Sequence, residues 1–158
     1  MTRGPVSLVA LVACACAGEP VVPLGCDDGP ADLEIRVHDG EFGSDNEALP
    51  YGRPPQGGAA YTPIALRMRG LVPELELEAT VAGEGGEPIG VADVRQRLIC
   101  SNTGEQSGWY VGAEVHLRYL DQPYEALEGQ QATLEVWLTD PEGQQVSAAV
   151  SGELVWEL

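Results

Sequence analysis

The chain has 158 residues, and its 25 acidic residues against eight basic ones give a formal net charge of −17 at neutral pH. A field of this sign repels phosphate backbones, so no nucleic-acid partner is expected. After a short N-terminal leader about 140 residues remain, which suits one domain with a single core.

The leader, residues 1–13, has the features of a lipoprotein-type signal peptide. Arg3 precedes an uncharged apolar run over residues 6–13, which is too short to span a bilayer. The run ends in Leu-Val-Ala-Cys and resembles the bacterial lipobox; the resemblance implies a lipid on Cys14 that holds the mature chain to a membrane. The alternative is cleavage after Ala17 by the ordinary signal peptidase, which would release a soluble, secreted protein.

Residues 14–31 are rich in proline and glycine and predict a flexible tether, so the folded domain is expected over residues 32–158. Cys26 and Cys100 both lie beside strand-like segments and are the candidate disulfide of an exported protein. Closing the loop between Cys26 and Cys100 would stabilise the domain by roughly 4 kcal/mol.

Beyond the tether the apolar residues recur with period two, the pattern of strands that have one buried and one wet face. The predicted strands cover residues 33–37, 64–68, 75–81, 115–119, 134–138 and 146–156, with a further short strand over 94–99. No segment predicts a convincing helix, because even the best one, residues 122–131, contains Pro123 and Gly129.

One hairpin can be derived in register from its turn. The sequence Asp-Pro-Glu-Gly at residues 140–143 has proline where a type I turn wants φ near −65° and glycine where the next residue must be left-handed. The resulting pairs are Leu138 with Val146, Val136 with Ala148 and Leu134 with Val150. The apolar faces of the two strands coincide, so turn chemistry and pattern agree.

A second hairpin is predicted around residues 70–73. Pairing Arg69 with Glu74 would bring Arg67 opposite Glu76 on the wet face, where opposite charges attract. The alternative is that these two strands belong to different sheets and that the connection crosses between them.

Six to eight short strands in one domain predict an all-β fold, a single antiparallel β-sandwich of immunoglobulin-like topology, with a small closed β-barrel as the alternative. The resemblance to immunoglobulin-like domains is architectural. The antibody pattern of two core cysteines flanking a core tryptophan is absent, since Trp109 follows Cys100 and Cys26 precedes the strands.

The most distinctive sequence motif lies in residues 49–71. The residues that carry a motif are Leu49, Pro50, Pro55, Gln56, Gly57, Gly58, Arg67, Gly70 and Leu71. They resemble uncharacterised lipoproteins of myxobacteria, in which a Leu-Pro segment leads to Gly-Pro-Gln-Gly-Gly and then to a strand ending in Arg-x-x-Gly-Leu. That family often has a histidine where this chain has Ala60, and it has no established function to lend.

Two interpretations of this loop are open. Gly57 and Gly58 permit positive φ, while Pro54 and Pro55 stiffen the approach to them. The loop either delivers the chain as a rigid corner into the next strand, which we favour, or contacts a ligand or partner. The contacting residues would be Tyr51, Arg53, Gln56, Gly57, Gly58 and Tyr61.

Catalytic and metal chemistry has little support. The two histidines are interpreted as solvated surface residues, and neither a zinc spacing, a nucleophile elbow nor a phosphate-binding glycine loop is present. No catalytic residue and no cofactor are therefore predicted. Weak calcium candidates are the loop carboxylates of Asp27, Asp28, Asp39, Glu41 and Asp45, whose spacing departs from an EF-hand.

These observations favour a non-enzymatic, lipid-anchored protein of the cell envelope, an outer-membrane lipoprotein that faces the periplasm or the cell surface. Its expected role is binding, adhesion or assembly, with the membrane as partner through the lipid and an envelope protein as second partner. The alternative is a secreted calcium-binding or hydrolytic domain that uses the acidic loops.

Overall fold

The period-two segments form strands of a ten-stranded sheet in a computed structural model that describes residues 25–26, 29–44, 48–120 and 123–157. The strands are β1 (Asp32–Val37), β2 (Ala48–Tyr51), β3 (Tyr61–Arg69), β4 (Glu74–Gly83), β5 (Pro88–Arg97), β6 (Ile99–Ser101), β7 (Trp109–Val111), β8 (Val115–Tyr119), β9 (Gln131–Thr139) and β10 (Gln145–Trp156). Two short 3₁₀ helices, η1 (Gly104–Gln106) and η2 (Tyr124–Ala126), complete the described elements. Neither has the length or hydropathy that a helix needs to cross a bilayer.

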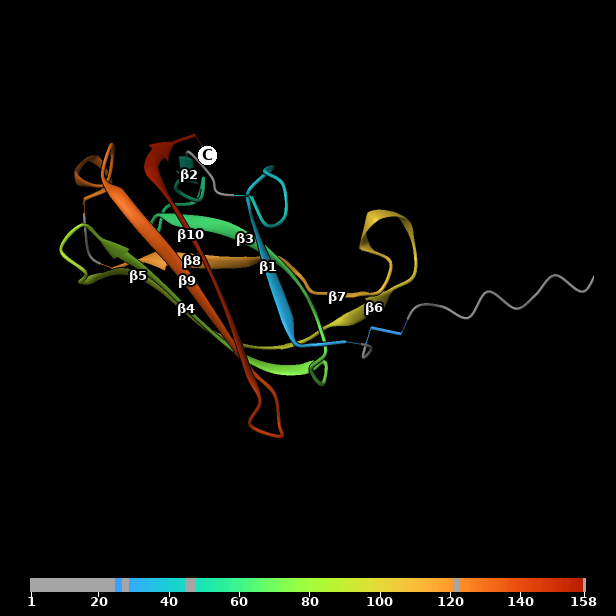
Figure 1. Cartoon of the computed structure of the whole chain (residues 1–158). Helices are drawn as coiled ribbons and strands as arrows, with labels where there is room; N and C mark the ends of the chain where they lie inside the picture. The colour runs from blue at the N-terminus through green and yellow to red at the C-terminus, as the bar shows by residue number, and fades with distance from the viewer. Residues whose placement is uncertain (1–24, 27–28, 45–47, 121–122, 158) are drawn as a thin grey trace, which may run out of the picture.

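The strand order confirms the all-β prediction and the sandwich. One layer is β1–β3–β8–β5 and the other is β4–β9–β10, which is the pairing of an immunoglobulin-like sandwich when these seven strands are taken in chain order. β5 pairs with β8 at its start and with β4 along its length, so it passes from one layer to the other. In Figure 1, β9 and β10 run steeply across β3 and β8. The sheet is not closed, so the barrel alternative was wrong.

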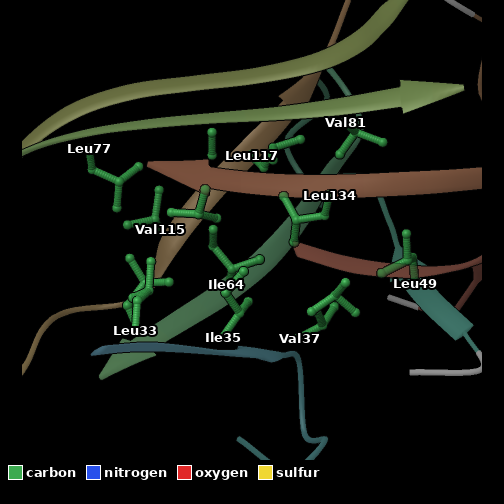
Figure 2. Packing of buried hydrophobic residues seen from close by; sticks show 14 of the residues in the cluster. Leu33, Ile35, Val37, Leu49, Ile64, Leu77, Val81, Val115, Leu117 and Leu134 are labelled. Atoms are coloured by element: carbon green, nitrogen blue, oxygen red, sulfur yellow. The ribbon is translucent and has the colours of Figure 1, made fainter. Parts of the chain in front are cut away.

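The core lies between the two layers. Inward residues of β4 and β9, such as Leu77 and Leu134, are fully buried against Ile64 of β3 and Ile35 of β1. Figure 2 shows these side chains converging from opposite sides. Each buried residue alternates with an exposed or half-buried neighbour, as a one-sided strand requires.

The register of the β9–β10 hairpin is as predicted. Leu138 lies opposite Val146, and the amide of Asp140 donates to the carbonyl of Gln144 at 3.0 Å. Gly143 has the left-handed φ of 80° that the turn requires. Turn chemistry and apolar pattern therefore act together here.

The second predicted hairpin was wrong. β3 pairs with β1, β7 and β8, whereas β4 pairs with β5 and β9, so the chain crosses between layers at residues 70–73. Arg67 lies opposite Glu34 rather than Glu76, and Glu76 pairs with Arg95. Opposite charges were available on more than one neighbouring strand, so charge pattern alone did not choose the partner.

Three short strands were not predicted, and one predicted strand is longer. β2 lies in the segment interpreted as a corner and runs parallel to β10, an exception to the antiparallel expectation. β6 and β7 pair with each other, and β7 also pairs with β3. β5 begins at Pro88, six residues before the predicted short strand.

Cys26 is attached to the sandwich by a disulfide and a backbone hydrogen bond. Cys26 is bonded to Cys100 of β6, with 5.8 Å between their Cα atoms, and Gly70 N–H donates to the Cys26 carbonyl at 3.1 Å. Cys26 is 2% exposed and belongs to the core, although it lies within residues 14–31, for which the sequence predicts a tether. The predicted signal peptide and the lipidation site Cys14 lie outside the described residues.

Candidate functional site

The outer face of β1, β3 and β7 gathers arginines and aromatic rings on a domain that is otherwise strongly acidic. We call this surface the arginine–aromatic face and define it by Arg36, Phe42, Arg67, Arg69 and Trp109. Arg67 and Arg69 take the outward positions of β3, and the β3–β7 register places Trp109 beside Arg69. Three strands distant in sequence therefore build one surface.

The face is a stack in which guanidinium groups alternate with rings. The Arg67 Cζ lies 4.6 Å from the centre of the Phe42 ring and 4.7 Å from that of the Trp109 ring. Arg69 lies over the other end of the stack, 4.7 Å from Trp109, and Arg36 lies 5.0 Å from Phe42. Cations at this distance from a ring centre are attracted by its electron-rich face.

Two carboxylates of β1 neutralise part of this charge. Arg67 Nε donates to Glu34 Oε2 at 2.8 Å, and Arg69 Nη2 donates to Asp32 Oδ2 at 2.8 Å. The Arg67 side chain is 17% exposed and that of Arg69 is 40% exposed. The stack therefore ties β1 to β3 and still presents polar atoms to solvent.

Arg36 has no such partner among the described residues. Its Nε is buried and makes no hydrogen bond, and the Nε of Arg69 is in the same condition. No described carboxylate forms an ion pair with Arg36, although the side chain is only partly buried. Arginine presents five N–H donors, so this end of the face retains capacity for an acceptor brought by another molecule.

The loop after β1 brings Phe42 onto the face because the chain reverses there. His38 adopts the left-handed φ of 48° and Gly43 a φ of 69°, and Gly43 N–H donates to the Ile35 carbonyl at 3.1 Å. A Cβ on Gly43 would lie 3.3 Å from Cδ of Glu34, so glycine lets the loop approach the strand closely. The loop thus covers β1 with an aromatic ring.

The opposite layer has a different outer surface, rich in carboxylates and hydroxyls. A groove of about 600 Å³ lies here among β4, β5 and the β9–β10 turn, and its charged lining residues are Glu74, Glu76, Arg95, Arg97 and Asp140. Arg95 and Glu76 form an exposed ion pair at 2.6 Å across it. Solvent screens such a pair, so the groove offers little fixed charge to a ligand.

The predicted ligand loop is only partly assembled. Gly57 and Gly58 have the expected positive φ, 83° and 128°, and they are exposed together with Arg53 and Gln56. The base of the loop is closed by reciprocal hydrogen bonds between Gly52 and Tyr61. These features fit the rigid corner that we favoured.

Tyr51 does not belong to that surface. Its side chain is 1% exposed, and its ring packs edge-on against Tyr119 and Trp156, with ring centres 5.7 and 5.3 Å away. Burial, together with a hydrogen bond to Glu128, raises the pKa of Tyr51 to about 12. Tyr51 is therefore a core residue that cannot contact a ligand without unfolding β2.

Tyr61 lies in strand β3 rather than in the loop. Its ring lies on that of His116, with ring centres 4.4 Å apart, on the outer face of β3 and β8. His116 is half-exposed, and its Nε2 lies 3.1 Å from Oε1 of Glu114. Its exposure agrees with its interpretation as a surface histidine. Of the six residues predicted to contact a ligand, Arg53, Gln56, Gly57 and Gly58 are exposed.

The calcium candidates do not converge where they are described. Asp39 and Glu41 are exposed in the loop after β1, and Asp27, Asp28 and Asp45 lie outside the described residues. No group of three or more histidine, cysteine, aspartate or glutamate side chains in the described part of the chain has a metal-binding arrangement. Within the described residues, the acidic loops therefore show no arrangement that would hold a metal ion.

No protein-family model and no curated protein matches the chain, so the comparisons assign this surface to no known family. The arginine–aromatic face was also missed by sequence reasoning. Its one sequence signal is the outward Arg67 and Arg69 of β3, since Phe42 lies in a loop and Trp109 in a three-residue strand.

Proposed function

We propose that this chain is a lipid-anchored envelope protein whose immunoglobulin-like sandwich binds an envelope protein partner through the arginine–aromatic face. The observation that carries the proposal is the stack of Arg36, Phe42, Arg67 and Trp109 on the outside of the sandwich. Arginine and aromatic residues are the types enriched at protein interfaces and at their energetic centres.

The charge of the domain makes this face distinctive. The protein carries a formal net charge of −17, yet three of its eight arginines lie within this one stack. A partner that presents carboxylates would be attracted here and repelled by the acidic surfaces elsewhere, which fixes its orientation. Arg36 is half-buried and forms no ion pair with a described carboxylate, so its guanidinium is the group we expect such a carboxylate to reach.

A purely structural role explains part of the stack. Arg67, the most buried of its ion-paired arginines, links two strands and two rings, and this accounts for its geometry without a partner. It does not account for Arg36, which lies over Phe42 and has no ion-pair partner among the described carboxylates. The proposal therefore depends on Arg36 more than on Arg67.

The anchored location rests on sequence and on the disulfide. The lipobox-like Leu-Val-Ala-Cys ending at Cys14 is the basis for the lipid, and an intramolecular disulfide suits an oxidising compartment outside the cytosol. The segment with Pro55, Gln56, Gly57 and Gly58 supports placing the chain with the myxobacterial-type lipoproteins that it resembles.

Affinity capture from the native envelope, with the full-length protein in detergent, tests the proposal. Arg36→Ala should lower recovery of the main co-purifying protein at least tenfold, because one lost charge-assisted hydrogen bond is worth roughly 1.5–3 kcal/mol. Recovery should also fall as salt is raised, since screening weakens attraction between charges.

The matched control is Arg53→Ala, which removes an exposed arginine from the Pro-Gln-Gly-Gly loop. It should leave recovery unchanged. If Arg53→Ala abolishes capture and Arg36→Ala does not, the loop is the binding surface and the proposed site is wrong. If neither variant changes capture, neither Arg36 nor Arg53 selects the partner, and the proposed role of Arg36 is wrong.

A further inference from the structure

The second half of β5 has an edge that no described strand covers. β5 pairs with β8 only at Gly90 and Val91, while its other side pairs with β4 down to Arg97. The exposed side chains here are those of Asp93, Val94, Arg95 and Arg97. An uncovered edge presents unpaired backbone donors and acceptors to another strand.

The backbone groups that point out of this edge can be assigned. Leu98 N–H donates to the Pro73 carbonyl on the β4 side, at 2.8 Å. Because successive residues of a strand direct their N–H and C=O groups to alternate sides, those of Asp93 and Arg95 point away from β4. These two residues are therefore available for a ladder with a second strand.

We propose that the occupant of this edge is the β5 edge of a second copy of the chain, paired antiparallel about a twofold axis at Val94. In this register Asp93 lies opposite Arg95 of the second copy, and Arg95 lies opposite its Asp93. The two pairs are of opposite charge, so the edge is complementary to itself. This proposal does not depend on the arginine–aromatic face.

Val94 gives independent support. It lies opposite Leu77 of β4, on the face that packs on the core, and Leu77 is fully buried. Val94 itself is 37% exposed, because nothing among the described residues continues the layer beyond β5. In the proposed pairing the two Val94 side chains meet across the axis and cover this open rim of the core.

The β7–β8 connection limits the length of the pairing. The Gln96 amide donates to the Ala113 carbonyl at 3.0 Å, so residues near 113 approach the far end of β5 through a side chain. The ladder is therefore short and centred on residues 93–95. A cross-link is the sensitive way to detect it.

Cysteine cross-linking in native membranes tests the pairing. Val94→Cys is introduced into the full-length chain together with Cys16→Ser, because Cys16 is the remaining cysteine besides Cys14, Cys26 and Cys100 and could form a cross-link of its own. This protein should form a disulfide-linked dimer on a non-reducing gel, because directly opposed residues of a non-hydrogen-bonded pair lie about 4.5 Å apart at Cα. The control is Ile99→Cys in the same background. Ile99 is 73% exposed, more than Val94, so random collisions would cross-link it at least as well.

Charge reversal separates specific pairing from proximity. Asp93→Arg in the Val94→Cys protein should reduce the dimer band to the level of the Ile99→Cys control, because two arginines would face each other. Adding Arg95→Asp should restore the band by recreating the opposite-charge pairs. Protease resistance of each variant checks that the sandwich is intact.

A Val94→Cys band that exceeds the Ile99→Cys band, falls with Asp93→Arg and returns in the double charge reversal supports the proposal. Any other combination in folded variants overturns it. A monomeric Val94→Cys protein in particular would mean that Asp93 and Arg95 protect the edge from pairing, as charged residues do on many edge strands.

Discussion

The backbone N–H of Gly70 donates a hydrogen bond of 3.1 Å to the carbonyl of Cys26 and fastens the start of the domain beneath the end of β3. The contact leaves no room for a side chain. A Cβ on Gly70 would lie 2.8 Å from the backbone of Pro30, and the residue has a left-handed φ of 74°. Two independent constraints therefore require glycine at this position.

Gly70→Ala should lower the free energy of unfolding by about 2–4 kcal/mol, which combines left-handed strain with a backbone clash. The measurement is urea denaturation followed by tryptophan fluorescence. Gly86→Ala is the matched control, because Gly86 has a similar φ of 79° but no atom within 4 Å of the position that a Cβ would take. It should cost only about 1 kcal/mol. Equal losses in the two variants would show that the clash is relieved without cost.

Removing the disulfide should destabilise the domain strongly. The bond closes a loop with a sequence separation of 74 residues. Cys26→Ala with Cys100→Ala should therefore lower the free energy of unfolding by about 2–5 kcal/mol, measured by urea denaturation under oxidising conditions. Cys16→Ala is the control and should leave the unfolding midpoint unchanged. A double variant as stable as the parent would mean that the unfolded chain is not appreciably restrained by the bond.

A buried hydroxyl pair should behave as a unit. Thr62 and Tyr119 are 1% and 4% exposed, and their hydroxyl oxygens are 2.8 Å apart. Tyr119→Phe leaves the Thr62 hydroxyl without that partner and should cost about 1–3 kcal/mol. Adding Thr62→Val should cost less than it does alone, because the stranded hydroxyl is removed. Strict additivity in the double-mutant cycle would contradict the pairing.

Stability should fall at alkaline pH because of two buried phenols. Burial raises the pKa of both Tyr51 and Tyr119 from 10.0 to about 12. A raised pKa contributes stability that is complete below pH 10 and is lost as pH rises toward 12, since only the unfolded chain ionises in that interval. Urea midpoints between about pH 9 and 11.5 should show this fall, and Tyr119→Phe should reduce its slope. An unchanged slope in that variant would exclude Tyr119 as a contributor.

The β9–β10 turn should depend on one carboxylate. Oδ1 of Asp140 accepts hydrogen bonds from the amides of Glu142 and Gln144, each at 2.9 Å, and the residue is 5% exposed. Asp140→Ala should cost about 2 kcal/mol by leaving these donors unpaired, and Asp140→Asn, which keeps an acceptor, should cost less. Glu142→Ala in the same turn is exposed and should change stability by under about 0.5 kcal/mol. Thermal unfolding of the three variants gives their order of stability. If Asp140→Asn loses as much stability as Asp140→Ala, the carboxylate hydrogen bonds do not stabilise the turn as predicted.

The parts of the fold that sequence predicted are those encoded locally. The β9–β10 hairpin follows from four turn residues and the alternation on either side, so its register needs no distant information. The parallel β2–β10 pair joins segments far apart along the chain, and β2 has only four residues, one of them Pro50. The residues around β2 do not predict a strand by themselves; β2 is a strand because it hydrogen-bonds to the distant β10.

The candidate site likewise has a part that the local sequence predicts and a part that depends on distant segments. Outward arginines on β3 follow from its alternation, but their neighbours depend on which strands flank it. Trp109 meets Arg69 only through the β3–β7 register, and Phe42 arrives through a left-handed reversal after β1. The loop that is rich in glycine and proline is closed at its base by hydrogen bonds between Gly52 and Tyr61, and the neighbouring Tyr51 lies in the core.

The disulfide between Cys26 and Cys100 also determines how the proposed lipid anchor would transmit force. A pull on Cys14 reaches the domain at Cys26, where a covalent bond passes the load to β6 before it reaches β1. Without that bond the same pull would peel β1 from β3 one hydrogen-bonded pair at a time, the easiest way to open a strand. If Cys14 carries the proposed lipid, the crosslink would protect β1 from being peeled off β3, and the point of attachment at Cys26 would lie within about 43 Å of the lipid, the extended length of twelve residues.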